Sequence, residues 1–237
     1  MQQTQPMPVF RRIVLLGFAV FFCVSSVALY AQGNGRTAAD FKILPLTAQT
    51  AEPLRKKFED WLDRTTHEKI TTQTSTHPHV VMWRASIQQV NLGHDTLHGL
   101  ERVNRITNKS VKYISDYAHH ELSDYWETPI ETIVEGGDCE DIALLKAVAL
   151  HHLGWPRENM HLLLGYTRYR GKKVAHAVLL VDHGGGHYVL DNLVDTLVPF
   201  SKSIIQPMYM LNMDNTQMYY TTTPPAGPFE SLSLLHI

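Results

Sequence analysis

The segment 139–153 constrains the fold most, because it has the length of a helix and almost no polar face. Its apolar residues would point in nearly every direction around a helix axis: Ile142, Ala143, Leu144, Leu145, Ala147, Val148, Ala149, Leu150 and Leu153. A helix without a polar face is buried on all sides. Gly154 and Pro156 predict where this helix ends. The rest of the chain must therefore fold around it.

The hydrophobic period changes across this helix. Before it, apolar side chains at helical spacing predict three helices, at 52–64, 80–90 and 96–113. We expect a Thr-rich loop at 65–79 and a mostly irregular segment at 116–137. After it, segments rich in Val, Leu and Tyr predict strands between turn signals: 161–169, 174–182 and 187–190, with 196–200 and 217–222 as further candidates. Helices followed by antiparallel strands predict an α+β domain with a central buried helix packed on an antiparallel sheet.

Residues 1–31 have the pattern of an export signal. Arg11 and Arg12 precede an uncharged apolar run at 13–29, and small residues follow at Ala28 and Ala31. A run of about 17 residues is also at the lower limit for a membrane-spanning helix, so an uncleaved anchor is the alternative. In both cases residues 32–237 form a single exported domain.

Charge and cysteine content exclude several classes of protein. The net charge is -2, and no basic stripe supports a nucleic-acid partner. Two cysteines exclude a disulfide-rich scaffold and a zinc site made of cysteines alone. Cys23 lies in the apolar run, so Cys139 is left without an intramolecular partner in the exported part. Such a thiol is either buried and inert or used in chemistry.

The position of Cys139 favours chemistry. Asp138 is a good N-cap, and Cys139 falls in the first turn of the buried helix. Free backbone N–H groups and the helix dipole stabilise a thiolate there, as a nucleophilic cysteine requires.

His176 is the best candidate for the base, because it lies in mid-strand between two small residues. A turn centred near 184 pairs position 176 with 191 or 192, which places Asp191 beside the imidazole. Asp195 is the fallback. Asp182 is about 20 Å away along the same strand, too far to orient the ring.

Three carboxylates surround the cysteine in the sequence: Asp138, Glu140 and Asp141. One interpretation is structural, because acids in the first turn of a helix are favoured and Asp138 with Asp141 resembles a capping box. However, negative charge beside a thiol opposes the thiolate. A hard divalent cation such as calcium, held by these oxygens, would cancel that effect.

An acyl-transfer reaction also needs hydrogen-bond donors for the oxyanion. The backbone N–H of Cys139 can supply one donor, and the indole N–H of Trp126 is a candidate for another. The alternative is that Trp126 packs only as core.

Four blocks of sequence resemble the bacterial transglutaminase-like cysteine proteinases of the LapG type, over roughly residues 44–201. They are Asp124-Tyr125-Trp126-x-x-Pro-x-Glu131, Gly137-Asp138-Cys139-Glu140-Asp141-x-Ala143-x-x-Lys146, Ala175-His176-Ala177-Val178 and Leu190-Asp191-Asn192. The resemblance implies a papain-like fold in which Cys139, His176 and Asp191 form the catalytic triad. It also implies calcium at the residues that flank the cysteine.

The same resemblance implies a periplasmic endopeptidase. Members of this type cut a large surface adhesin near its N-terminus, at two adjacent alanines, and the release of the adhesin disperses a biofilm. An inner-membrane receptor of the LapD type, which senses cyclic di-GMP, holds such proteases inactive.

Three alternatives remain open on the sequence. A transglutaminase or amidase would use the same triad, and incorporation of a labelled amine would reveal it. A non-catalytic binding module would hold Cys139 buried and slow to react with iodoacetamide. With 14 histidines, a metal carrier is a further alternative that metal analysis would detect.

Overall fold

The computed structural model describes residues 41–43 and 51–221. The predicted export segment, residues 1–31, lies outside the described residues. Among the described residues, no helix has both the length and the apolar character needed to cross a membrane.

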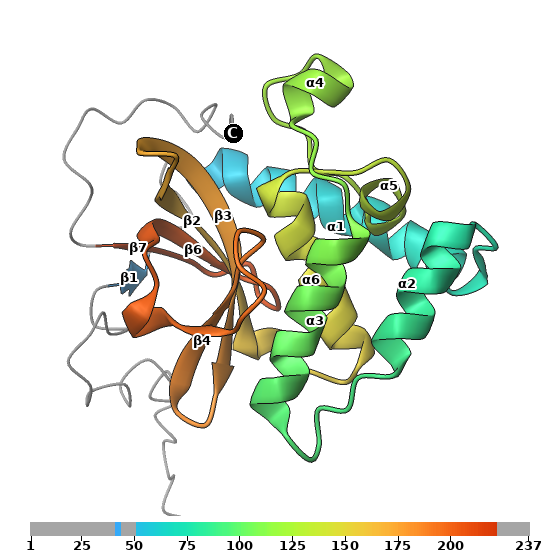
Figure 1. The fold of residues 1–237 in the computed structure, drawn as a ribbon. Helices are drawn as coiled ribbons and strands as arrows, with labels where there is room; N and C mark the ends of the chain where they lie inside the picture. The colour runs from blue at the N-terminus through green and yellow to red at the C-terminus, as the bar shows by residue number, and fades with distance from the viewer. Residues whose placement is uncertain (1–40, 44–50, 222–237) are drawn as a thin grey trace, which may run out of the picture.

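Helices form one side of the molecule and a sheet forms the other (Figure 1). The helices are α1 (Ala51–Thr74), α2 (Pro78–Gln88), α3 (Thr96–Ser110), α4 (Asp116–His120), α5 (Pro129–Val134) and α6 (Cys139–His152). The strands are β1 (Phe41–Ile43), β2 (Met160–Tyr169), β3 (Lys172–His183), β4 (Gly186–Leu190), β5 (Val198–Pro199), β6 (Gln206–Asn212) and β7 (Met218–Thr221). All pairings are antiparallel, in the order β1-β7-β6-β2-β3-β4-β5.

The central helix α6 confirms the α+β prediction. It packs on β3 and β2 with one side and on α3 and α5 with others. Eleven of its residues are buried, and the eight apolar ones join the main core with Leu162, Leu179 and Leu211 of the sheet. A smaller apolar cluster, which includes Val178 and Phe200, lies apart from this core. The buried helix therefore organises the domain as its sequence predicts.

Three local predictions were wrong. Helix α1 continues to Thr74, through part of the predicted loop, because Glu68 in this extension accepts hydrogen bonds from Thr128 Oγ1 (2.6 Å) and from the backbone N–H of Ile130 (3.1 Å). The segment predicted to be mostly irregular contains the short helices α4 and α5.

Strand β6 was missed because it contains Pro207, which pairs with Gly165 where the register between β2 and β6 shifts. An irregularity of this kind is one of the positions at which a strand tolerates proline.

The contact between β2 and β6 leaves no room for a side chain at Gly165. A Cβ atom there would lie 2.2 Å from the carbonyl oxygen of Gln206. Gly165 is also the partner of His176 across β2 and β3. The glycine therefore allows β6 to approach the strand next to His176.

We expect Gly165→Ala to lower the free energy of unfolding by about 2 kcal/mol or more, because the backbone of β6 has to move away. Denaturant unfolding measures the change. Gly93→Ala is the matched control, since its added Cβ would lie 3.4 Å from Asn91 Oδ1 and should cost much less. Equal stability of the two variants would contradict the proposed close approach.

Candidate active site

Cys139 is the first residue of α6 and is almost completely buried. The chain reaches it through Gly136, whose φ of 108° is in the region that favours glycine. A Cβ at Gly136 would lie 2.5 Å from the carbonyl oxygen of Lys112. Gly137 exchanges backbone hydrogen bonds with Lys112 and Ile114, which fixes the entry to the helix. The Gly-Gly sequence is therefore required by close packing just before the cysteine.

The thiol of Cys139 donates a hydrogen bond to Glu140 Oε2 at 3.1 Å. Burial raises the pKa of Cys139 well above its ordinary value, and the charges of Glu140 and Asp138 raise it further. A backbone hydrogen bond from Ala177 acts in the opposite direction. The sequence predicted that the helix N-terminus would favour a thiolate. Burial and the two carboxylates outweigh that effect, so the protein groups by themselves keep the thiol protonated.

His176 is fully buried in β3, and its Nε2 lies 2.8 Å from Asp191 Oδ1. Burial would raise the pKa of Asp191, but its hydrogen bond with His176 and the charge of that imidazole lower the pKa overall. The backbone N–H of Leu193 also donates to Asp191 Oδ1 at 2.9 Å. Asp191 is therefore held as an ionised partner of the imidazole.

The predicted register around Asp191 was wrong, although the structure places its carboxylate against His176. Strand β4 ends at Leu190, which pairs with Leu179. Asp191 follows directly after that strand and reaches His176 from a loop. Asp182 instead binds His161 and His187, at 3.0 Å and 2.5 Å.

Helix α6, which begins at Cys139, packs on β3, the strand that carries His176. His176 Nδ1 is buried and has no hydrogen-bond partner among the described residues. The ring nitrogen opposite Asp191 is thus unengaged, and the thiol is bonded to Glu140.

Lys146 lies within the apolar helix, and the sequence patterns assigned it no role of its own. It is fully buried, and burial lowers its pKa to about 7 against the opposing charges of Asp191 and Asp195. The visible signal was the one lysine among the apolar side chains of segment 139–153. Its charge helps to keep Asp191 ionised, because it contributes to the lowered pKa of that carboxylate.

Carboxylates from two distant segments meet beside the cysteine, and we call them the acid cluster: Asp116, Asp124, Glu127, Asp138, Glu140 and Asp141. Their side-chain oxygens form overlapping groups in which the atoms lie within 4.8 Å of one another. Burial and the charge of Asp138 raise the pKa of Asp116 to about 7. The sequence indicated the three acids at the start of the helix. It missed the other three because they lie in the segment that was expected to be irregular.

Asp141 differs from its neighbours in the acid cluster. Its two carboxylate oxygens accept backbone hydrogen bonds from Glu127 (2.8 Å) and Asp138 (2.9 Å), so it ties the first turn of α6 to the segment before α5. Buried oxygens of Asp116, Asp138 and Glu140 have no hydrogen-bond partner among the described residues. Oxygen atoms of this kind are the ligands that calcium prefers, so the donor set fits a calcium ion.

Trp126 is buried, and its ring packs edge-on against Phe58 with Lys57 Nζ 5.3 Å from the ring centre. Its indole N–H has no hydrogen-bond partner among the described residues. The packing fits a core role, while the unpaired donor fits a role in binding an oxyanion.

The fold and the site define the chain as a cysteine protease of the transglutaminase-like class. The family model described as "Bacterial transglutaminase-like cysteine proteinase BTLCP" matches residues 69–221, which is more than half of the chain. The protein therefore belongs to the bacterial transglutaminase-like cysteine proteinase family.

Solved structures support the same fold. Calcium-bound LapG from Legionella pneumophila is 23% identical with a TM-score of 0.53, over 72% of this chain and 94% of that chain. EGTA-treated LapG from the same organism is 23% identical with a TM-score of 0.50, over 73% of this chain and 86% of that chain. A search of curated proteins found no significant match.

We expect Glu140→Gln to increase the rate of alkylation of Cys139 by iodoacetamide several-fold at pH 8 in the presence of EGTA. Loss of the adjacent charge lowers the pKa of the thiol, so the rate profile shifts to lower pH. Mass spectrometry of the modified protein gives the rate. Glu158→Gln, on the exposed surface, is the control and should match the wild type. An unchanged profile for Glu140→Gln would show that Glu140 does not set the thiol pKa.

Proposed function

We propose that this cysteine protease is a calcium-dependent endopeptidase of the periplasm. It cleaves the N-terminal region of a large surface adhesin at an Ala-Ala site, and release of the adhesin promotes biofilm dispersal. The observation that carries the proposal is the arrangement of Cys139 at the head of a buried helix, beside the strand that holds the His176–Asp191 pair. The export pattern of residues 1–31 supports the location, with an inner-membrane anchor as the alternative.

The reaction follows from the roles that the three side chains can take. His176 accepts the thiol proton through its free Nδ1, and the sulfur of Cys139 attacks the peptide carbonyl. The protonated imidazole then gives its proton to the leaving amine, and a thioester remains on Cys139. His176 next removes a proton from water, which hydrolyses the thioester. Asp191 orients the ring and stabilises its charged form throughout.

The oxyanion that forms in each step needs donors that are already in place. The backbone N–H of Cys139 at the helix N-terminus supplies one, and the unpaired indole N–H of Trp126 is proposed as another. Because both groups belong to rigid, buried parts of the fold, they need little reorganisation during the reaction.

Calcium would be held by the predicted ligands Asp138, Glu140 and Asp141, together with Asp116 and Asp124 from the segment before α5. Both oxygens of Asp141 also accept backbone hydrogen bonds. When bound, the cation supplies positive charge that offsets these carboxylates and lowers the pKa of the nearby thiol. Glu140 then no longer serves as the acceptor for the thiol proton, which leaves His176 to take it. The calcium-bound and EGTA-treated forms of Legionella LapG support a calcium-binding role in this family.

The substrate and the regulator follow from the family resemblance. Ala175 and Ala177 flank His176 but are buried in the core, so the Ala-Ala site is proposed from the resemblance alone. An inner-membrane receptor of the LapD type, controlled by cyclic di-GMP, is proposed as the inhibitor.

Cys139→Ala should abolish cleavage of an adhesin segment that contains adjacent alanines, because the nucleophile is lost. Gel electrophoresis and mass spectrometry of the products measure cleavage and its position. The buried site makes a stability control necessary, so thermal unfolding of the variant should accompany the assay. Cleavage that persists in a folded Cys139→Ala protein would remove Cys139 from the mechanism.

Asp191→Asn should lower kcat/KM at least 100-fold, because the imidazolium loses its ionised partner. Asp195→Asn is the matched control, since Asp195 is exposed and is hydrogen-bonded to Asn108 rather than to His176. Steady-state cleavage of a fluorogenic peptide gives both values. Equal losses in the two variants would argue against a specific role for Asp191.

Chelation by EGTA should stop cleavage, and excess calcium should restore it, whereas magnesium should not, because a multi-carboxylate site suits the larger ion. Calcium should also raise the melting temperature by binding the folded state. The Cys139→Ala protein should show the same thermal shift, which separates metal binding from catalysis. Full activity in EGTA would remove calcium from the proposed function.

A further inference from the structure

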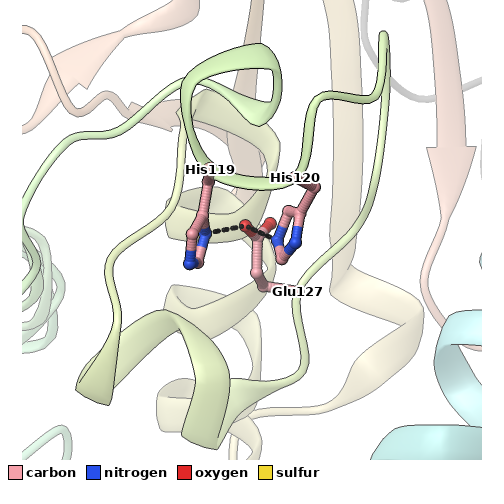
Figure 2. A group of neighbouring side chains, drawn as sticks. All are labelled: His119, His120 and Glu127. Atoms are coloured by element: carbon pink, nitrogen blue, oxygen red, sulfur yellow. Dashed lines mark hydrogen bonds and ion pairs between the residues drawn. The ribbon is translucent and has the colours of Figure 1, made fainter.

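A second group of possible metal ligands lies at the end of α4 and shares Glu127 with the acid cluster. His119 Nδ1 is 3.2 Å from Glu127 Oε1, and His120 Nε2 is 3.0 Å from the same oxygen. Figure 2 shows the two imidazoles on either side of the carboxylate. The three ligand atoms all lie within 4.8 Å of one another.

The chemistry of this group differs from that of the acid cluster. Two imidazole nitrogens and one carboxylate oxygen suit zinc and similar transition metals, whereas calcium takes oxygen ligands. Ligands at about 2.0–2.1 Å from a tetrahedral zinc ion are about 3.3 Å apart. The observed separations of 3.0 Å and 3.2 Å between nitrogen and oxygen are close to that value. Small side-chain movements would therefore admit an ion.

Neighbouring groups already orient these side chains. The second nitrogen of His119, Nε2, lies 3.1 Å from Glu135 Oε2, and a carboxylate on the remote ring nitrogen is a usual support for a metal-bound histidine. The His120 ring packs on Tyr125, with ring centres 4.4 Å apart. The Glu127 side chain is fully buried, while the two histidines are 19% and 25% exposed. An ion could thus reach the site from solvent and meet a fixed carboxylate.

We propose that His119, His120 and Glu127 form a zinc-type transition-metal site with a fourth position for water. Its Glu127 belongs to the acid cluster but is not one of the proposed calcium ligands. The ion would join the end of α4 to the chain just before α5. Asp116 is the first residue of α4, and Asp124 lies between α4 and Glu127. A bound ion would therefore stabilise the part of the fold that places these two carboxylates in the acid cluster. The existence of the site does not depend on the proposed substrate or on calcium activation.

Isothermal titration of the purified protein with Zn²⁺, in excess calcium to saturate oxygen-only sites, tests the proposal. The wild type should bind one ion that is lost, or bound at least 100-fold more weakly, in His119→Gln/His120→Gln. The control is His77→Gln/His79→Gln, a second pair of histidines in ring contact that lies on the exposed surface. It should bind Zn²⁺ like the wild type.

Two further measurements address geometry and folding. Co²⁺ in the wild type should give the intense visible absorption of a tetrahedral site, and the double variant should lose it. Glu135→Gln keeps all three ligands and should weaken Zn²⁺ binding about 10-fold. This variant serves as the test if circular dichroism shows that His119→Gln/His120→Gln is unfolded. Absence of Zn²⁺ binding by the wild type, or equal affinity in the wild type and the histidine or Glu135 variants, would overturn the proposal.

Discussion

The burial of the first turn of α6 is the constraint on which the site depends. Cys139, Glu140 and Asp141 enter the core together at the head of a helix that the protein covers on all sides. Burial makes each negative charge costly, and the pKa values of Cys139, Glu140 and Asp141 are all raised well above their ordinary values. The position that would normally activate a thiol is therefore one in which the protein alone holds it neutral.

This conflict gives the acid cluster a functional meaning. Apolar side chains beside the cysteine would avoid this conflict. Here, however, the thiol of Cys139 donates a hydrogen bond to Glu140. Carboxylates beside a thiol oppose its ionisation as long as their own negative charge is not balanced. A bound cation that balances this charge removes their opposition to the thiolate. Dependence on a cation would thus follow from the residues that flank the cysteine, and control of the enzyme would act through the same charges that hold the proton on sulfur.

The His176–Asp191 pair is a different kind of contact, because it is complete within the protein. Its two members are one short hairpin apart, and Lys146 adds a buried positive charge that favours the ionised acid. The segment from α4 to α5 has the opposite character. It brings Asp116, Asp124 and Glu127 to the first turn of α6, and the backbone hydrogen bond from Glu127 to Asp141 ties the two together. Cys139 is therefore hydrogen-bonded to a cluster that depends on packing, and its helix packs on the strand that carries one member of a preassembled pair.

The sequence by itself determined the buried helix, the cysteine at its head and the pairing of His176 with Asp191 across one hairpin. These features follow from periodicity, from turn residues and from a short hairpin, all of which act over a few residues. Only the tertiary structure decided that the thiol bonds to Glu140, that Asp191 reaches His176 from beyond the end of β4, and that segment 116–127 completes the acid cluster. Such contacts depend on how separate elements pack, and local pattern does not specify the approach of one element to another. Pro207 and the extension of α1 show the same limit, because a register irregularity and the bonds of Glu68 override local preference.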